Sequence, residues 1–381
     1  MKRDKSLTSE LFRNIGNGHF GNMLGLMPDP DRIMQRFGNA SDVLRKLKDD
    51  PHVWSCIQSR KSGSLSLEHI ILPESASDFV TDEIRRILNN IDLRRLESDV
   101  LDAPLFGRQF LEIIWRNGSK NKPMLVPDQI VAKPQEWFAF DQSGKLKYKR
   151  SGMNEARDIP PMKLISVLYE PTYHNPYGSS LLSKCFWPVR FKNGGIRFWV
   201  NFTEKYGMPI LLGQYSRGAS NEESAKLAEE LANMSEDAVI VAPSDIKIEM
   251  REAVRSTSVE MYHELITYCN AEISKALLSQ TLTTEIGTGS YAASQTHYKI
   301  RHEVIAADAR LIESAINELI RHIVDLNFGK GKYPKFKLII NEADNADRAE
   351  RDVKIAQSGC VKFTKDYWMR TYGFREGDLA E

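Results

Sequence analysis

The chain has 381 residues, a formal net charge of +1 and an apolar fraction of 41%. This length allows two or three domains, and the near-neutral charge excludes a protein that binds nucleic acid through a globally basic surface. Its apolar runs are far shorter than the about 20 residues of a membrane-spanning helix. The first residues lack the apolar run of a signal peptide, so we expect a protein kept in the cytoplasm, without membrane contact.

The N-terminal stretch, residues 1–40, is polar and rich in glycine and asparagine. It contains a literal GxGxxG pattern, from Gly16 to Gly21. This pattern binds a nucleotide only where a strand precedes it and a helix follows, because the phosphate then meets free backbone N–H groups. Here a short polar lead precedes it and Pro28 and Pro30 follow, which favours a flexible N-terminal arm over a nucleotide site.

The next stretch, residues 41–172, reads as a mixed α+β domain. The pattern predicts a helix over residues 41–61, a strand over 64–72 and a second helix with apolar residues from Phe79 to Ile91. Five strand candidates follow, over residues 110–116, 125–132, 137–140, 145–150 and 164–170. Turn signals at Asn117 and Ser143, each followed by glycine, favour hairpins between them.

A long aromatic helix is predicted after a turn at residues 173–178, within the segment 173–207. Wheel positions place one apolar side together: Leu182, Cys185, Phe186, Val189, Ile196, Trp199, Val200 and Phe202. The basic residues fall largely on the other side: Lys184, Arg190, Arg197 and Lys205. This basic face is either ordinary solvated surface or a surface that faces phosphates without reading bases. Pro188 and the pair Gly194 and Gly195 are expected to kink or loosen the helix.

A small α/β insert occupies residues 208–257 in this interpretation, with a strand over 209–214, a helix over 221–234 and a hairpin formed by 238–242 and 246–250. Helical spacing returns over residues 258–280. A second long helix is predicted over 291–330, because no proline or glycine interrupts residues 291–328. A strand lies within 331–345, and the last segment, 346–381, is charged and then helical.

Between the two long helices lies a segment rich in threonine and glycine, residues 281–290. β-Branched and glycine residues make it a poor helix. Its candidate functional residues are Thr281, Thr283, Thr284, Glu285, Gly287, Thr288, Gly289 and Ser290. The simpler interpretation of the whole region is a long helical hairpin inside a core. Composition alone does not decide between this hairpin and a functional loop held between two long helices.

Catalytic and metal-binding patterns are absent from the sequence. The pairs His263–Glu264 and His302–Glu303 lack the second histidine four positions after the first that a zinc helix needs, because Thr267 and Ala306 stand there. No phosphate-binding loop and no nucleophile elbow occur. The four cysteines form no CxxC pair, so buried thiols are expected rather than disulfides. We therefore expect no catalytic residue, no metal and no cofactor.

Several stretches together resemble phage portal proteins of the Mu-like branch. They include Asp50-Pro51-His52-Val53, Asn175-Pro176-Tyr177-Gly178 with the residues after it, and the run from Ile273 to Thr283. Residues 202–212 and 287–297 fit as well. The likeness covers most of residues 40–350, and the set is more specific than any one stretch.

The resemblance implies a portal-protein fold of class α+β and a ring of identical subunits, usually twelve, at one capsid vertex. The terminase would pump DNA through the ring, and the DNA would later leave toward the tail. By this likeness the parts are assigned as follows: arm 1–40, wing 41–172, first stem helix 173–207, clip 208–257, second stem helix 258–280, channel loop 281–290, long helix 291–330, wing return strand 331–345 and crown 346–381. The crown is short for the family.

The implied partners are other copies of the chain, the terminase large subunit, a head–tail adaptor, capsid and scaffold proteins, and double-stranded DNA that passes non-specifically. The implied place is the virion, after assembly in the host cytoplasm. The near-zero net charge suits a channel, because every fixed cationic contact with phosphate adds a salt-dependent hold on DNA. Aromatic helix faces suit packing between ring neighbours.

Two rival hypotheses stay open at this point. One is an enzyme that binds a nucleotide at Gly16 to Gly21 or hydrolyses a substrate at a site assembled in space. The other is a DNA-binding head scaffold that forms no ring. Lys184, Arg190, Arg197 and Lys205 are expected to face water, an acidic neighbouring subunit or DNA.

Overall fold

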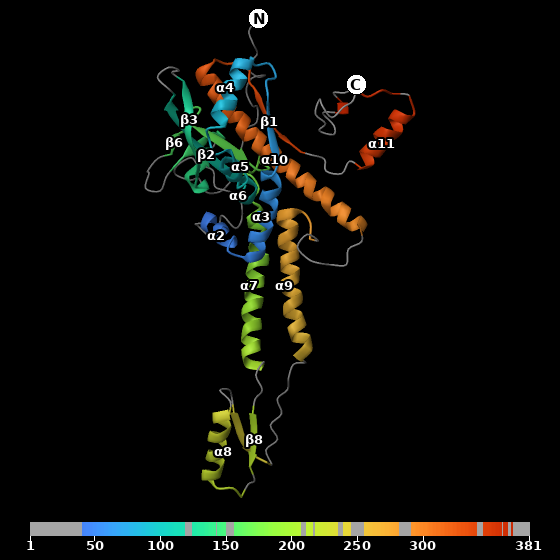
Figure 1. Cartoon of the computed structure of the whole chain (residues 1–381). Helices are drawn as coiled ribbons and strands as arrows, with labels where there is room; N and C mark the ends of the chain where they lie inside the picture. The colour runs from blue at the N-terminus through green and yellow to red at the C-terminus, as the bar shows by residue number, and fades with distance from the viewer. Residues whose placement is uncertain are drawn as a thin grey trace. The chain divides into compact units, whose positions relative to one another are not determined.

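The computed structural model describes residues 40–118, 124–141, 143–149, 156–206, 211–215, 218–234, 239–244, 255–281, 291–340, 346–359, 361–364 and 367–368. The chain divides into two compact units, residues 1–338 and 339–381, and each is treated by itself. The described part of the chain mixes helices with short strands, in agreement with the predicted α+β class (Figure 1).

The helices have the following bounds: α2 Ala40–Leu47, α3 Pro51–Leu65, α4 Asp78–Leu88, α5 Leu93–Val100, α6 Ala103–Phe106, α7 Leu181–Tyr206, α8 Asn221–Met234, α9 Arg255–Leu278, α10 Tyr291–Asn327 and α11 Ala346–Gln357. The 3-10 turn η2 covers Gln135–Trp137. The strands have the following bounds: β1 Glu68–Leu72, β2 Arg108–Asn117, β3 Leu125–Lys133, β4 Phe138–Phe140, β5 Leu146–Tyr148, β6 Arg157–Asp158, β7 Leu164–Leu168, β8 Leu211–Tyr215, β9 Val239–Pro243 and β10 Lys335–Ile339.

The helix predicted over residues 41–61 is two helices, α2 and α3, because the sequence restarts helix formation at Pro51. Proline fits the first turn of a helix, where its missing N–H costs nothing. Asp50 is the N-cap, and its carboxylate accepts hydrogen bonds from the backbone N–H groups of His52 and Val53 at 2.9 and 3.1 Å. Since α3 continues to Leu65, the strand expected over 64–72 is only β1, Glu68–Leu72.

Two antiparallel sheets form the strand-rich part of the first unit. The first has the order β3-β2-β7, and the second has the order β4-β5-β6. A shift in register between Ile114 and Trp115 marks an irregularity in the β2–β3 pairing. The side chains of Phe110 and Leu111 on β2 and of Ile165 on β7 are fully buried, and since Phe110 and Leu111 are consecutive, both faces of β2 are covered. Burial of these apolar side chains is the main source of stability for the sheet.

The helix α10 covers this sheet and closes the fold. Its C-terminal half contributes a buried stripe at helical spacing that packs against α3, α4, α5, β3 and β7: Ile312, Ile316, Leu319, Ile320 and Ile323. Asn317 fixes the following strand, because its side chain both donates to the backbone of Phe336 and accepts from it, at 2.9 and 2.8 Å. β10 then pairs with β1 in a two-stranded sheet.

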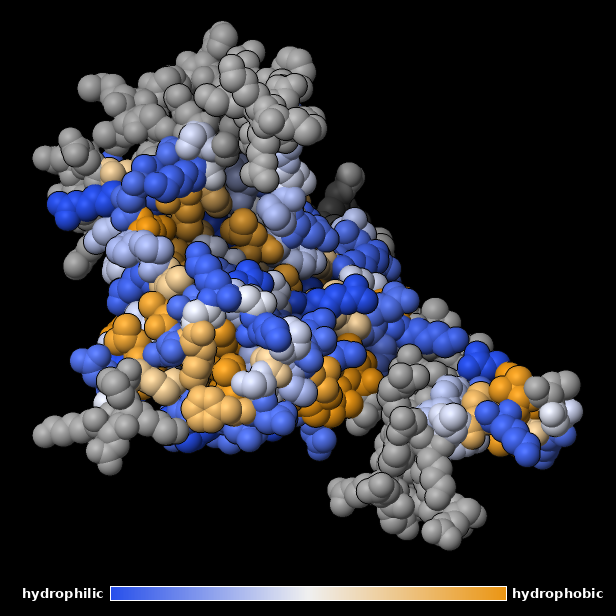
Figure 2. All heavy atoms as spheres, turned by 90° about the horizontal axis from the view of Figure 1, so that it is seen from above, coloured by the Kyte–Doolittle hydropathy of each residue, from blue (hydrophilic) through white to orange (hydrophobic). Residues whose placement is uncertain are grey.

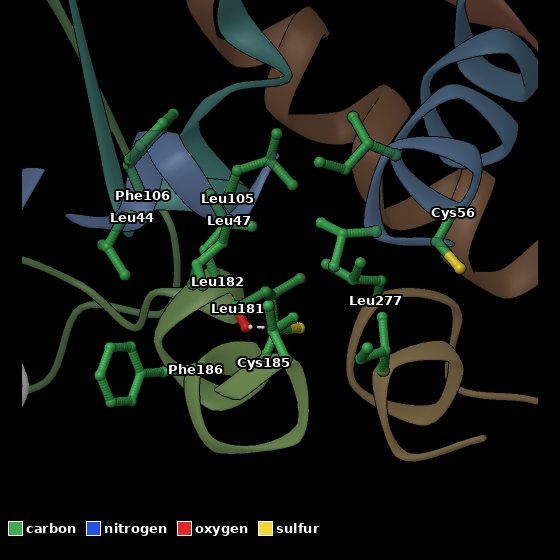
Figure 3. Close-up of a cluster of buried hydrophobic side chains, with 14 of the residues drawn as sticks. Leu44, Leu47, Cys56, Leu105, Phe106, Leu181, Leu182, Cys185, Phe186 and Leu277 are labelled. Atoms are coloured by element: carbon green, nitrogen blue, oxygen red, sulfur yellow. Dashed lines mark hydrogen bonds between the residues drawn. The ribbon is translucent and has the colours of Figure 1, made fainter. Parts of the chain in front are cut away.

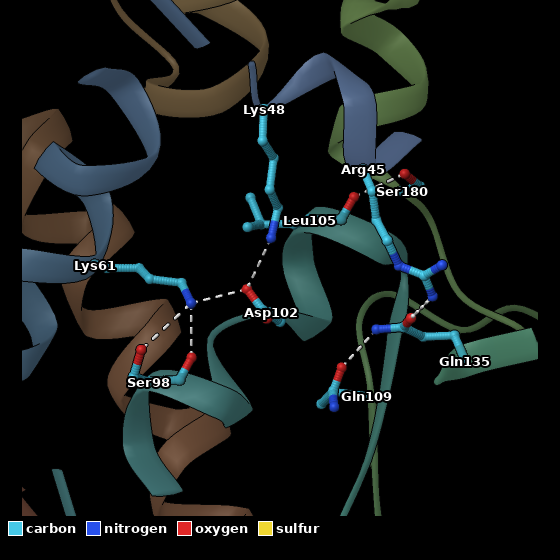
Figure 4. A network of polar contacts seen from close by, with 9 residues as sticks. All are labelled: Arg45, Lys48, Lys61, Ser98, Asp102, Leu105, Gln109, Gln135 and Ser180. Carbon is cyan, nitrogen blue, oxygen red and sulfur yellow. Dashed lines mark hydrogen bonds and ion pairs between the residues drawn. The ribbon is translucent and has the colours of Figure 1, made fainter. Parts of the chain in front are cut away.

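The helices α5 and α6 were not expected from the sequence, and a polar network holds the turn between them (Figure 4). Asp102 accepts a hydrogen bond from Lys61 of α3 at 2.8 Å and lies 3.5 Å from the ammonium of Lys48. Lys61 also donates to the carbonyl oxygen of Ser98 at 2.7 Å. Burial lowers the pKa of Lys48, because removal from water disfavours its charge.

The insert between α7 and α9 is a parallel βαβ unit in its described part. β8 and β9 pair in parallel, and α8 lies between them in the sequence and covers them. Gly213 permits this close packing, since a Cβ atom there would lie 2.6 Å from a methyl carbon of Leu231. The second strand of the predicted hairpin, 246–250, falls outside the described residues.

The second unit contains α11 and the short stretch after it. Asp352 is buried on α11 and accepts a hydrogen bond from the hydroxyl of Tyr367 at 2.6 Å. The ring of Tyr367 also stacks on Phe363, with the centroids 4.5 Å apart. Asp352, Phe363 and Tyr367 therefore form a small packed centre among the described residues of this unit.

Hydrophobic and hydrophilic side chains alternate over the surface seen from above in Figure 2. The orange areas are small and lie between blue ones, as on an ordinary solvated surface. None of the helices in the described part of the chain is both long enough and apolar enough to cross a bilayer.

Candidate functional site

The helices α7 and α9 lie side by side and form the candidate site (Figure 1). A buried hydrophobic cluster packs the N-terminal part of α7 and the C-terminal part of α9 against α2, α3 and α6 (Figure 3). The buried residues that the two helices contribute are Leu181, Leu182, Cys185, Phe186, Val189, Ile273, Leu277 and Leu278. Burial raises the pKa of the Cys185 thiol to about 12, so this cysteine is an inert packing residue. The predicted apolar side of α7 is thus confirmed over residues 182–189.

A buried ion pair anchors α7 to α3. The ammonium of Lys192 lies 2.5 Å from the carboxylate of Asp50 and donates to the side-chain oxygen of Asn270 at 3.1 Å. The side chains of Lys192 and Asp50 are 7% and 4% exposed. Asp50 is also the N-cap of α3. The same carboxylate therefore caps α3 and pairs with Lys192 of α7, which in turn contacts Asn270 of α9.

A second buried ion pair joins α3 to both α9 and α10. Arg60 donates to the two carboxylate oxygens of Asp308 on α10, each at 2.8 Å, and to the carbonyl oxygen of Leu277 at 2.8 Å. A bidentate guanidinium–carboxylate pair fixes orientation as well as distance. Burial alone would lower the pKa of Arg60, but the hydrogen bonds and charge of Asp308 raise it overall, so the guanidinium stays charged.

The outer part of the α7–α9 pair exposes large apolar side chains. On α7, Phe198 is 63% exposed, and Trp187 stacks on Phe191 with ring centroids 5.7 Å apart. On α9, Met261 and Tyr268 are exposed as well. Apolar side chains gathered on one outer surface mark a contact with another molecule more often than scattered ones do. The geometry therefore indicates an assembly surface.

The family model for the portal protein of Mu bacteriophage matches residues 41–374. The chain belongs to the Mu portal protein family. The portal protein of Escherichia phage Mu is 31% identical to it over 304 residues, which cover 73% of this chain and 55% of the phage Mu protein. The chain therefore spans about half the length of this curated relative.

Solved structures share the fold of this Mu-family chain. A chain of the virion of a native gene transfer agent particle matches with a TM-score of 0.59 and 15% identity, over 88% of this chain and 93% of that one. A chain from the neck of that native particle, computed with C12 symmetry, matches with a TM-score of 0.55 and 14% identity, over 88% and 94%. These likenesses support the α+β portal-type fold.

The predicted basic residues of this Mu-family chain lie on α7. Lys184, Arg190 and Arg197 are exposed, as expected for a solvated or partner-facing surface. The ammonium of Lys184 donates to Ser179 at 3.2 Å, and the guanidinium of Arg190 lies over the ring of Phe186, 5.6 Å from its centroid. The side chain of Lys205 lies outside the described residues. Which of these residues meets DNA stays a prediction.

The apolar side of α7 continues past the buried cluster. Ile196 and Val200 belong to that side and are 40% and 50% exposed, because the first half of the helix alone reaches the cluster. The proline and the two glycines do not interrupt α7, which is one helix from Leu181 to Tyr206 (Figure 1), and the expected kink or loosening stays a prediction. Lys192 was not singled out from the sequence, because its burial depends on Asp50, far away along the chain.

Of the predicted channel loop, only Thr281 belongs to the described residues, and it is half-buried. Thr283, Thr284, Glu285, Gly287, Thr288, Gly289 and Ser290 lie outside them. The helices on either side are fixed: α9 ends at Leu278, with Ser279 in a left-handed conformation at φ 59°, and α10 begins at Tyr291. The GxGxxG segment also lies outside the described residues.

Among the described residues, no group of three or more His, Cys, Asp or Glu side chains is placed to hold a metal ion. His302, from one of the two His–Glu pairs, packs against the ring of Tyr298 with centroids 4.5 Å apart. The arrangement found in this part of the chain is therefore one of helix packing and surface contact.

Proposed function

We propose that this chain acts as a portal protein. Copies of it form a ring at one capsid vertex, and the ring is the conduit for genome packaging by the terminase and for DNA exit into the tail. The match of residues 41–374 to the Mu portal family carries this proposal. The exposed aromatic side chains of α7 and α9 support it, because a closed ring needs extended contact surfaces on every subunit.

The ring has twelve copies in this proposal. The neck structure with a similar chain fold was computed with C12 symmetry, which supports that number. The parts of the chain take the family roles in the order predicted from the sequence: residues 41–172 form the wing, α7 and α9 the stem, residues 208–257 the clip, α10 the long helix behind the channel loop, and residues 346–381 a short crown.

The proposed role is structural rather than catalytic. The terminase large subunit hydrolyses ATP and docks on the clip, and a head–tail adaptor replaces it after packaging. Double-stranded DNA passes without sequence-specific contacts, since a channel that bound phosphates tightly would resist movement. Residues 281–290 form the channel loop in this proposal. Capsid and scaffold proteins surround the ring in the virion, which assembles in the host cytoplasm.

Electron microscopy of the purified full chain tests the ring. We expect annular particles with a central hole and a rotational symmetry of twelve. A chain that stays monomeric at every protein and salt concentration would contradict the proposal. Tight, salt-sensitive binding of that monomer to linear duplex would instead favour a DNA-binding head scaffold.

Substitution of Gly287 and Gly289 by proline tests the channel loop. Proline restricts the backbone, so DNA packaged per head should fall severalfold while annular particles still form. The matched control replaces the same two glycines by alanine, which leaves more backbone freedom, and it should package closer to the unsubstituted protein. Heads that fill normally with the proline variant would exclude residues 281–290 as the passage for DNA.

A further inference from the structure

A stripe of three exposed aromatic side chains and the half-buried Gly194 runs along α7, beside the contact of Gly195 with α9. Trp187, Phe191, Gly194 and Phe198 follow one another at steps of three and four, so they share one face of the helix. The three aromatic residues are each at least half exposed. Cys185, Val189 and Lys192 lie on the opposite side, where they are buried toward α9 and α3.

Two neighbouring glycines of α7 have different surroundings. A Cβ atom on Gly195 would lie 3.0 Å from a methyl carbon of Leu265 on α9, so close packing inside the chain accounts for that glycine. A Cβ atom on Gly194 would meet nothing within 4 Å. Glycine inside a helix is less favourable than alanine, so packing within one copy gives no reason for glycine at 194. It leaves a notch on the exposed stripe, between Phe191 and Phe198.

The outer face of α9 has the complementary form. Met261, Glu264, Tyr268 and Glu272 recur at steps of three and four, and Tyr268 is 63% exposed. Acidic side chains therefore stand one turn before and one turn after a projecting tyrosine. On α7, basic side chains stand about one turn before and after the notch, since Arg190 and Arg197 flank Gly194. The outer face of α9 is therefore acidic with a projecting side chain, whereas the outer face of α7 is basic with a notch.

The notch and the tyrosine lie at the same level along the helix pair. Lys192 on α7 contacts Asn270 on α9, and Gly195 lies against Leu265. Since α7 and α9 run in opposite directions, Gly194 therefore stands level with Tyr268. Rotation about a ring axis moves a subunit sideways without changing its height. In a ring whose axis follows these helices, the notch of one copy meets the tyrosine of the next.

We propose that the outer face of α9 on one copy packs on the outer face of α7 on the next, with Tyr268 seated in the notch at Gly194. The same register brings Arg190 near Glu272 and Arg197 near Glu264. Glu272 already pairs with Lys275 of its own helix at 2.7 Å, and both side chains are solvent-accessible, so Arg190 joins that pair. This inference rests on the proposed ring and names the surfaces through which it closes.

Filling the notch tests the contact. Gly194→Trp should reduce the yield of annular particles at least tenfold, because the new ring occupies the place of Tyr268 from the next copy. The matched control is Thr203→Trp, which adds the same side chain at an exposed position of α7 that shares the face of Lys192, opposite the stripe. Both variants should show the circular dichroism of the unsubstituted chain. If Gly194→Trp folds and assembles as well as Thr203→Trp, the proposed contact is wrong.

Cross-linking tests the register directly. In a Cys360→Ser background, the double variant Arg197→Cys and Glu264→Cys should form disulfides between copies and give a ladder of multimers on a non-reducing gel. The three remaining native cysteines are buried. Each single variant should give no ladder.

The results separate the two proposals. Annular particles without a cross-linked ladder would overturn this register and leave the portal ring standing. Absence of annular particles from the unsubstituted chain would overturn the ring itself. A ladder from the double variant, together with loss of rings in Gly194→Trp, would support the contact.

Discussion

The two halves of α7 have the same kind of residues and opposite environments. The first half, residues 181–192, is surrounded by α2, α3, α6 and α9, and it buries leucine, phenylalanine and even a lysine. The second half packs mainly on α9 and leaves Ile196, Phe198 and Val200 exposed. The apolar residues of α7 therefore do not indicate which positions of the helix are buried within one copy. The first half has a buried side that its own chain completes, although Trp187 and Phe191 on its other side are exposed. In the proposed ring, the second half gains its contacts from other copies.

The largest effect should come from breaking the buried ion pair that supports the first half. Arg60→Ala leaves Asp308 charged and unpaired in the interior, which should cost about 3–5 kcal/mol of unfolding free energy. Chemical denaturation of dilute protein measures the cost. The control Lys145→Ala removes an exposed pair with Asp158 and should cost less than about 1 kcal/mol. Equal losses of unfolding free energy in the two variants would show that burial does not make the Arg60 pair more important for stability than an exposed pair.

Two phenylalanines of α7 allow a direct comparison of a buried position with an exposed one. Phe186 is 2% exposed and Phe198 is 63% exposed. Phe186→Ala should destabilise the dilute protein by about 3 kcal/mol through loss of buried area and a cavity. Phe198→Ala should change stability by less than about 1 kcal/mol yet weaken ring assembly, as measured by the particle yield. A strong loss of monomer stability in Phe198→Ala would remove the distinction between the halves.

A pH effect is expected from Glu97 of α5. Burial raises its pKa from the ordinary value of 4.5 to about 7 in the folded chain. Between these two values the folded state holds a proton that the unfolded state has released, so stability is lost as pH rises through about 7. Glu97→Gln should remove this dependence and gain on the order of 2 kcal/mol relative to the unsubstituted chain at pH 8, but little at pH 4. Denaturation midpoints at both pH values measure it.

The smallest change in unfolding free energy is expected from alanine substitution of Gly194 and Gly195. In dilute protein, Gly194→Ala should raise the unfolding free energy by roughly 0.5–1 kcal/mol, because alanine favours the helix and meets open space. Gly195→Ala should give no such gain, since its methyl group would press on Leu265. Thermal unfolding of the two variants side by side checks the difference in sign.

Much of the chain was predictable because local signals agree with the final packing. The two long helices, the strand β10 and the exposed Lys184, Arg190 and Arg197 follow from spacing alone. The break at Pro51 was readable in principle, because aspartate before proline is a helix-start signal. The exposure of Ile196 was not readable, since an amphipathic pattern cannot tell burial within one chain from burial between chains.

Long-range polar contacts were beyond the sequence for another reason. Lys192 and Asp50 are 142 positions apart, and Arg60 and Asp308 are 248 apart. Each member reads as surface charge until its partner is known, because lone charges are usually solvated. The parallel pairing of β8 with β9 was missed because a turn signal after β9 favoured a hairpin with the next stretch.

The guanidinium of Arg60 also has a mechanical consequence. It holds the last turn of α9 and the middle of α10 at once, so a pull on one helix is transmitted to the other through a side chain rather than along the backbone that links them. A protease cut between Thr281 and Tyr291 should therefore leave two fragments that elute together under native conditions.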